Sequence, residues 1–321
     1  MALRIVFCGT PAFALPSLRH LLAQPDFEVL GVVTQPDRPR GRGQATSSSA
    51  VKDAALAAGI AVYQPEKIKS DSAYAYFKRA APDAVVIIAY GQIISQKLID
   101  IPRLGWTNLH GSLLPKYRGA APIHWAIANG ETRTGVTTMR VDAGLDMGPT
   151  LLTWETEIGA DETAPELSAR LAEAGAPLVA ESLRRLERGE IGPQPQDNSQ
   201  ATLAPLLKKE DGRVDWRQRA AKIYNRIRGL QPWPGAFTTF RGKTCHIWGK
   251  PASAEAVSAT MASEAGDKAG TIVVKGGELL VACGEGTALR LEFAQMEGRK
   301  RVTAREFASG ARLGSGDRFI S

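Results

Sequence analysis

The hydrophobic and polar positions in the first half of the chain alternate between strand-like and helix-like patterns. The continuously apolar run 84–89 predicts a buried strand, because a strand covered on both faces has no polar side. Strands are also expected over 3–8 and 29–33. Further strands are expected just before Asn108 and over 135–140 and 150–156. Helices are expected over 15–23 and 50–58, and from a capping pattern at 163–166 to about residue 189. The alternation predicts an α/β fold with a doubly wound, mostly parallel sheet.

The last third of the chain has a different pattern. Residues 191–206 are rich in Gln, Pro, Asn and Ser, which is typical of a linker. A helix is expected next, over 216–229. Five short strands are expected after it, over 235–240, 244–248, 270–274, 278–283 and 289–295. Short strands separated by glycine-containing turns predict a small β-barrel. We therefore expect a first domain over 1–190, a linker over 191–206 and a second domain over 207–321.

Charge separates the two expected domains. The chain has 321 residues, with 40 Lys and Arg against 33 Asp and Glu and a net charge of +7. Residues 1–190 hold 20 basic and 20 acidic residues, whereas 191–321 hold 20 basic and 13 acidic. A basic back part suggests that this part faces a polyanion such as nucleic acid. A basic surface that only aids solubility is the alternative.

Composition also limits the class of protein. Three cysteines, Cys8, Cys245 and Cys283, form no C-x-x-C pair and fit a reducing cytosol. The longest apolar run, 84–90, is far shorter than the ~20 residues of a membrane span. Residues 1–8 are predicted as a strand, so no cleavable signal is expected. These features predict a cytoplasmic protein without a membrane segment.

The turn after the first strand argues against two common cofactor sites. A dinucleotide site needs G-x-G-x-x-G there, but Gly9 is followed by Thr10 and Pro11. The phosphate-binding pattern G-x-x-x-x-G-K-[ST] is also absent. A nicotinamide, flavin or nucleoside triphosphate role is therefore not expected.

Asn108 and His110 are the first candidates for chemistry. They are two residues apart at the end of an expected strand, so their side chains project to the same side, at the edge where open α/β sheets bind ligands. An amide beside an imidazole suits acyl transfer, because both can face an oxygen that becomes negatively charged. The imidazole can also carry protons near neutral pH. Taken alone, a histidine at a strand end is more often structural.

Asp146 adds a carboxylate in a glycine-bracketed loop over 142–149. It could orient His110 or relay a proton; the alternative is that Asp142 and Asp146 are only turn residues. No serine stands in a G-x-S-x-G elbow, and no base is near the cysteines in sequence. Direct transfer without a covalent enzyme intermediate is the simpler hypothesis.

With the run 112–119, these three residues resemble the signature of the 10-formyltetrahydrofolate-dependent formyltransferases. The runs 34–43 and 231–236 narrow the resemblance to the branch that formylates the α-amine of initiator methionyl-tRNA. The resemblance covers residues 4 to about 307. It implies a Rossmann-like catalytic domain, a C-terminal OB-like barrel, catalysis by Asn108, His110 and Asp146, no metal, and a monomer.

The resemblance also implies two binding regions. The folate co-substrate, 10-formyltetrahydrofolate, is expected to contact Ser112, Leu113, Leu114 and Pro115, and Tyr90, Gly91, Gln92 and Ile93. The acceptor arm of the tRNA is expected to contact Arg38, Arg40, Arg42, Lys208, Lys209, Arg219, Lys222 and Arg226. Phosphate contacts by these basic residues would position the tRNA without reading its sequence.

Two other functions fit parts of this pattern. A nucleotide-sugar formyltransferase, a glycinamide ribonucleotide formyltransferase or a formyltetrahydrofolate hydrolase would keep Asn108, His110 and Asp146 but would not need the arginine loop. A non-catalytic tRNA-binding module would need the basic back part but not an intact Asn-His-Asp set.

Overall fold

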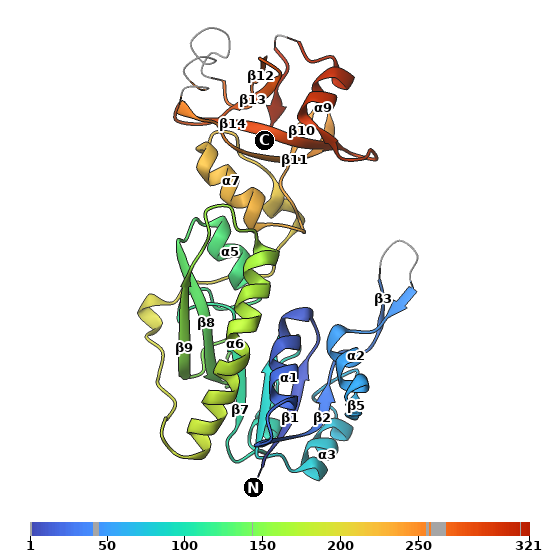
Figure 1. The fold of residues 1–321 in the computed structure, drawn as a ribbon, viewed down its shortest axis with the longest axis vertical. Helices are drawn as coiled ribbons and strands as arrows, with labels where there is room; N and C mark the ends of the chain where they lie inside the picture. Colours follow the sequence, from blue (N-terminus) through green and yellow to red (C-terminus); the bar gives the residue numbers. More distant parts are fainter. Residues whose placement is uncertain (1, 41–44, 143, 255–256, 258–267, 315) are drawn as a thin grey trace. The chain divides into compact units, whose positions relative to one another are not determined.

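The computed structural model describes residues 2–40, 45–142, 144–254, 257, 268–314 and 316–321 (Figure 1). The chain divides into two compact units. The first comprises Met1–Pro122, Arg133–Glu157 and Glu166–Pro205, and the second comprises Ile123–Thr132, Ile158–Pro165 and Leu206–Ser321. Within the described residues, no helix combines the length and the apolar character that crossing a membrane requires.

A seven-stranded sheet forms the centre of the first unit, in the order β5–β2–β1–β6–β7–β8–β9. The strands are β1 (Leu3–Gly9), β2 (Phe27–Val33), β5 (Val62–Tyr63), β6 (Ala84–Ile88), β7 (Trp106–His110), β8 (Arg133–Arg140) and β9 (Thr150–Glu157). The first five in this order are parallel, and β8 and β9 are antiparallel to their neighbours. The chain winds outward from β1 in both directions, which confirms the predicted α/β class and its mostly parallel, Rossmann-like sheet.

Helices lie between these strands in the chain, and one follows the last of them (Figure 1). They are η1 (Ala12–Ala14), α1 (Leu15–Leu22), α2 (Ala50–Ala57), α3 (Asp71–Ala80), α4 (Gln96–Ile99), α5 (Pro122–Ala128) and α6 (Ala164–Glu187). Of these, α5 belongs from Ile123 on to the second unit. The expected helices correspond to α1, α2 and α6. The helix α3 was not predicted. It begins where the Ser70 side chain accepts a hydrogen bond from the backbone N–H of Ala73, and it buries only Ala73 and Phe77.

The second unit is built around an antiparallel sheet in the order β12–β13–β14–β11–β10–β16, with β15 paired to β14. Its strands are β10 (Phe237–Phe240), β11 (Lys243–Pro251), β12 (Ile272–Lys275), β13 (Glu278–Ala282), β14 (Ala288–Met296), β15 (Val302–Thr303) and β16 (Phe319–Ile320). Thr271 bridges Arg318, and Phe319 N–H donates to the Gly270 carbonyl over 2.8 Å. This link joins the two edges of the sheet and confirms the predicted barrel.

The barrel core and its helices include elements that the sequence pattern did not reveal. The core contains Trp216, stacked on Phe319 with ring centroids 5.5 Å apart. The strands β15 and β16 have two residues each, too few for a periodicity. The helices are η3 (Lys209–Gly212), α7 (Ala220–Gly229) and α9 (Ala304–Ala311). The expected helix over 216–229 therefore begins four residues later than predicted.

The segment 191–206, interpreted as a linker, belongs to the first unit up to Pro205. It forms backbone hydrogen bonds with other parts of that unit. Gln194 and Thr150 exchange two backbone hydrogen bonds of 2.8 Å. The short helix η2 (Asn198–Gln200) follows, and Ala204 N–H then donates to the Arg118 carbonyl over 2.7 Å. The division into 1–190, 191–206 and 207–321 stays a prediction, but this segment is ordered by its neighbours rather than free.

Candidate active site

The strand β7 places Asn108 and His110 on one face of the first unit's sheet. Asn108 pairs with Ile87 on β6, and His110 pairs with Thr137 on β8, so neighbouring strands hold the backbone of both residues. His110 is buried, with 5% of its surface exposed, while Asn108 is partly exposed. Among the residues that the structure describes, none forms a hydrogen bond with the Asn108 side-chain amide, which leaves its N–H groups for a ligand.

The orientation of the His110 ring follows from one hydrogen bond. Its Nε2 lies 2.9 Å from the backbone oxygen of Tyr117. A carbonyl oxygen only accepts, so Nε2 carries a proton and donates it. In the neutral ring Nδ1 is then unprotonated, and this nitrogen lies 3.7 Å from Oδ2 of Asp146. The site therefore contains a histidine whose Nδ1 faces a carboxylate.

Asp146 is held in place by its own loop and by the segment after β7. Its φ of 51° is in the left-handed region, which is uncommon for a residue other than glycine. Its Oδ2 accepts a hydrogen bond of 2.9 Å from Gly119 N–H. Asp142, by contrast, accepts from Gly144 N–H two residues on, the bond of an Asx-turn. Asp142 is a turn residue, and Asp146 is the carboxylate that faces His110.

The predicted folate-contact segment Ser112–Pro115 follows β7 directly. Ser112 is buried, and its hydroxyl donates to the Lys116 carbonyl over 2.6 Å. The hydroxyl of Thr137 donates to Ser112 O and accepts from Leu114 N–H. These bonds fix the shape of the segment and occupy the Ser112 hydroxyl, so Leu113, Leu114 and Pro115, which are partly exposed, offer the contact surface.

The second predicted folate segment follows β6, which neighbours β7. Tyr90 is 2% exposed and packs in a hydrophobic cluster with Val6 and Phe77, and burial raises the pKa of its hydroxyl well above the usual value. Gln92 accepts from Ile68 N–H over 2.7 Å. Both side chains are thus directed into the protein. Gly91 and Ile93 are exposed and are the parts of this segment that a ligand can reach.

Two of the three predicted arginines of the front part lie on a small hairpin. Its strands are β3 (Arg38–Arg40) and β4 (Ala45–Ser47), and they pair antiparallel. Arg38 is exposed, Arg40 pairs with Ala45 through the backbone, and Arg42 lies outside the described residues. An ion pair between Asp37 and Lys52 anchors the base of this hairpin to α2.

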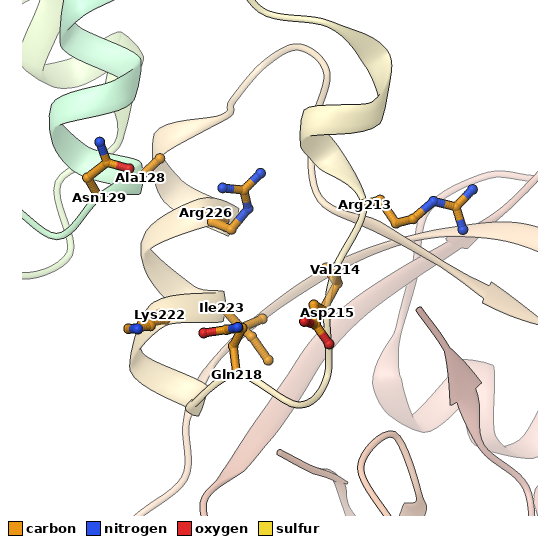
Figure 2. Close-up of a pocket in the computed structure, with 9 residues that line it drawn as sticks. All are labelled: Ala128, Asn129, Arg213, Val214, Asp215, Gln218, Lys222, Ile223 and Arg226. Carbon is orange, nitrogen blue, oxygen red and sulfur yellow. The ribbon is translucent and has the colours of Figure 1, made fainter. Parts of the chain in front are cut away.

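In the second unit, two of the predicted basic residues line a pocket of 540 Å³ (Figure 2). Lys222 and Arg226 project from α7, and Arg213 lies on the segment that precedes this helix. The complete lining is Ala128, Asn129, Arg213, Val214, Asp215, Gln218, Lys222, Ile223 and Arg226. Three cationic side chains against the single carboxylate of Asp215 favour an anionic ligand.

The other predicted basic residues of this unit are exposed and do not line the pocket. Lys208 and Lys209 lie at the start of η3 and are exposed. Arg219 is the N-cap of α7 rather than part of it, and it pairs with Glu285 at 3.4 Å. Of the predicted contacts Arg219, Lys222 and Arg226, the last two therefore lie on α7, and Arg219 directly precedes it.

The structure reveals a buried arginine that the sequence analysis did not single out. Arg118 is 5% exposed. Its Nε and Nη2 donate to Oε1 of Gln196 over 3.0 and 2.7 Å, and Nη2 also donates to Asn198 over 2.8 Å. Both amides belong to the segment interpreted as a linker, whose polar composition carries no periodicity that indicates these contacts.

Neither the cysteines nor a metal centre provides a competing site in the described part of the chain. Cys8, Cys245 and Cys283 are buried and unpaired. Burial raises the pKa of Cys245 to about 11 and of Cys283 to about 12, so both stay as poorly nucleophilic thiols at neutral pH. Among the described residues, no three His, Cys, Asp or Glu side chains are grouped as a metal site.

Comparison with known proteins places both units in one family. Residues 3–183 match the family model for formyl transferase, and residues 206–312 match that for the formyl transferase C-terminal domain. The methionyl-tRNA formyltransferase of Solibacter usitatus is 56% identical over 311 residues, which is 97% of this chain and 96% of the relative. That of Koribacter versatilis is 52% identical and covers 98% of both chains.

Solved structures with the same fold include a sugar 3N-formyl transferase, WlaRD, at a TM-score of 0.66 and 18% identity, over 94% of this chain and 100% of that one. HypX from Aquifex aeolicus, in complex with tetrahydrofolic acid, also has this fold, with a TM-score of 0.63 and 17% identity over 100% of this chain and 51% of HypX. At these identities the likeness shows the fold alone. The close sequence relatives decide the assignment: the chain belongs to the methionyl-tRNA formyltransferases and is an enzyme of that family.

Proposed function

We propose that this enzyme transfers the formyl group of 10-formyltetrahydrofolate to the α-amino group of methionyl-initiator-tRNA. The product is N-formylmethionyl-tRNA, which serves translation initiation. The observation that carries the proposal is the buried His110, whose Nδ1 lies 3.7 Å from Oδ2 of Asp146, beside the Asn108 amide, which has no hydrogen-bond partner among the described residues. This set lies in a chain that is 56% identical to a methionyl-tRNA formyltransferase.

The reaction begins with attack by the α-amine on the formyl carbon. An α-amine has a pKa of about 7.7–8.0, so a substantial fraction is neutral and nucleophilic near neutral pH. A bond forms between this nitrogen and the formyl carbon, and the formyl oxygen becomes an oxyanion. The Asn108 amide donates a hydrogen bond to that oxygen, where preorganised donors contribute most to catalysis.

His110 carries the proton that the attacking amine loses. Nδ1 accepts it directly or through a water molecule, while Nε2 keeps its proton on the Tyr117 carbonyl. The imidazolium that forms is balanced by the Asp146 carboxylate, and its Nδ1–H becomes a second donor to the oxyanion. Collapse of the intermediate breaks the bond between the formyl carbon and N10 of the folate. This nitrogen takes up the proton carried by His110, so that tetrahydrofolate leaves and the imidazole returns to its neutral form.

The folate binds at the edge of the sheet where β6 and β7 end. Ser112–Pro115 and Tyr90–Ile93 follow these two adjacent strands, so the donor would lie next to Asn108 and His110. Two proteins with this fold support a folate donor: the structure of WlaRD was solved in the presence of 5-N-formyl-THF, and that of HypX in complex with tetrahydrofolic acid. The mechanism assigns no step to a metal.

The basic residues hold the tRNA through its phosphates. Arg38, Arg40 and Arg42 contact the acceptor arm, and Lys208, Lys209, Arg219, Lys222 and Arg226 contact more of the backbone. Arginine offers bidentate geometry for phosphate oxygens. We place the enzyme in the cytoplasm, where charged tRNA is found, and propose that it acts as a monomer.

The test offers 10-formyltetrahydrofolate together with one of three acceptors: initiator methionyl-tRNA, elongator methionyl-tRNA or a dTDP-linked amino sugar. The sugar arm is included because a sugar formyltransferase shares the fold. We expect formylation of the initiator tRNA and little of the other two. Transfer to the sugar, or release of formate without any acceptor, would refute the proposed acceptor.

A further inference from the structure

One amide side chain outside the proposed catalytic set makes four hydrogen bonds around it. Gln196 Nε2 donates to the backbone oxygens of Asp146, over 2.9 Å, and Gly148, over 2.6 Å. Its Oε1 accepts from Nε and Nη2 of Arg118, over 3.0 and 2.7 Å. A glutamine amide has two N–H donors and an oxygen with two lone pairs, so the Gln196 side chain is fully used.

The chemistry of the four partners fixes which way the amide points. Two carbonyl oxygens can only accept and a guanidinium can only donate. The reversed amide would place its oxygen against the two carbonyls and its N–H groups against Arg118. Only the observed orientation satisfies all four contacts, so Gln196 joins the loop of Asp146 to the segment of Arg118.

Each end of this link is next to a group that orients the proposed catalytic pair. Arg118 lies between Tyr117, whose carbonyl accepts from His110, and Gly119, whose N–H donates to Asp146. The backbone of Arg118 is also bonded to the segment 191–206 that contains Gln196, since Ala204 N–H donates to the Arg118 carbonyl. At the other end, Gln196 bonds the carbonyl of Asp146 itself.

The backbone conformation of Asp146 is one that the bonds from Gln196 can stabilise. A non-glycine residue in the left-handed region costs of order 1–3 kcal/mol and persists only where its surroundings hold it. Asp146 has a φ of 51°, and the two bonds from Gln196 flank it, at its own carbonyl and at that of Gly148. In this conformation its carboxylate reaches both Gly119 N–H and His110.

We propose that Gln196 is a positioning residue for formyl transfer: it holds Asp146 in the conformation that faces His110. The proposal rests on the proposed function for the reaction it serves. In this proposal the segment 191–206 helps to hold the active-site residue Asp146 and does not only connect the two units. Gln196 does not touch the reacting atoms and acts through Asp146.

The main variant is Gln196→Glu. The carboxylate keeps an acceptor for Arg118, with added charge complementarity, but it cannot donate to the carbonyls of Asp146 and Gly148. This variant keeps the contact with Arg118 and loses the two hydrogen bonds to the loop of Asp146. Gln196→Ala removes both halves of the link. The matched control is Gln200→Ala in the same segment, because Gln200 is exposed and, within the described part of the chain, its side-chain amide bonds only the nearby Asp197.

Two readouts test the proposal. Hydrogen–deuterium exchange of the amides in 144–149 and 117–119 should rise in Gln196→Glu and not in the control. The kcat for formyl transfer should fall roughly 10- to 100-fold, as small misplacements of catalytic groups do, while the KM for the tRNA changes less than about threefold. In an Asp146→Asn background the same substitution should lower kcat less than about threefold, because residues that act as a unit are not additive.

Unchanged exchange in Gln196→Glu would overturn the proposal. So would an equal loss of kcat in the Asp146→Asn background, or an equal loss in Gln200→Ala. Failure of the wild-type enzyme to formylate methionyl-tRNA would instead refute the proposed function, and the exchange measurement would still decide whether Gln196 holds the loop.

Discussion

Oδ2 of Asp146 lies 3.7 Å from Nδ1 of His110. This distance exceeds that of a hydrogen bond but is short enough for strong interaction between charges in a buried site. Both groups are held by the same short segment, because Tyr117 O accepts from His110 over 2.9 Å and Gly119 N–H donates to Asp146 over 2.9 Å. The pair is therefore preorganised by the backbone and has room to tighten when substrates bind.

Removing the imidazole should separate catalysis from binding. His110→Ala should lower kcat by roughly 10²- to 10⁴-fold, the usual contribution of a positioned acid–base group. The dissociation constant for methionyl-tRNA, measured by filter binding, should stay within about threefold of the wild type, because the proposed phosphate contacts are elsewhere. Loss of tRNA binding in this variant would contradict the catalytic role.

Gly119 is a position where a side chain has no room. Its φ is 122°, and a Cβ there would lie 2.6 Å from the backbone oxygen of Ala204. Gly119→Ala should destabilise the protein by roughly 1–3 kcal/mol and lower kcat, since the N–H of this residue holds Asp146. Urea denaturation and steady-state kinetics measure the two effects. Gly192→Ala is the control, because no atom lies within 4 Å of its added Cβ; an equal effect there would refute the steric argument.

Arg38 tests the role of the front hairpin in tRNA binding. Arg38→Ala should weaken tRNA binding roughly fivefold, about 1 kcal/mol for one charge-assisted contact, and leave folate binding unchanged. The slope of log K against log salt concentration should decrease by about 1. Arg188→Ala is the control, since Arg188 is an exposed arginine paired with Glu190. The same salt slope in both variants and the wild type would exclude a phosphate contact by Arg38.

Asp317 should make barrel stability depend on pH. Hydrogen bonds from Arg241, at 2.8 and 3.1 Å, and then from Gly314 N–H lower the pKa of its carboxyl below the usual value. A lowered folded-state pKa adds stability above the unfolded value of about 3.9, and this stability is lost as pH falls through the folded value. Asp317→Asn should cost roughly 1 kcal/mol at pH 7, since Arg241 is half exposed, and less at pH 3. Urea denaturation at both pH values checks this, and an equal cost at both would contradict it.

Local sequence pattern was sufficient for much of the fold and for part of the candidate site. The apolar run at β6 is buried on both faces, so its strand was predictable from composition alone. Asn108 and His110 were identified as candidates because strand geometry places side chains two residues apart on one face. That argument needs no knowledge of distant contacts, and the register of β7 agrees with it.

The rest of the site depends on contacts that a local pattern does not encode. Gln196 and Arg118 are 78 residues apart in the chain, and neither has a periodic neighbour that indicates burial. Tyr90 was expected to line the folate pocket, but whether its ring faced the ligand or the core depended on tertiary packing, and the ring is in the core. Short elements such as β15 and β16 exist only because neighbouring strands supply their hydrogen bonds.

The most direct test of the account is the single-turnover rate of formyl transfer for Asn108→Ala. Enzyme is used in excess over initiator methionyl-tRNA with saturating 10-formyltetrahydrofolate, so that the observed rate reports the chemical step and not tRNA binding. Loss of one oxyanion donor should lower this rate by about 10²- to 10³-fold, with the same N-formylmethionyl-tRNA as product. A rate equal to that of the wild type would contradict the assignment of the formyl-transfer site to the face that carries Asn108 and His110.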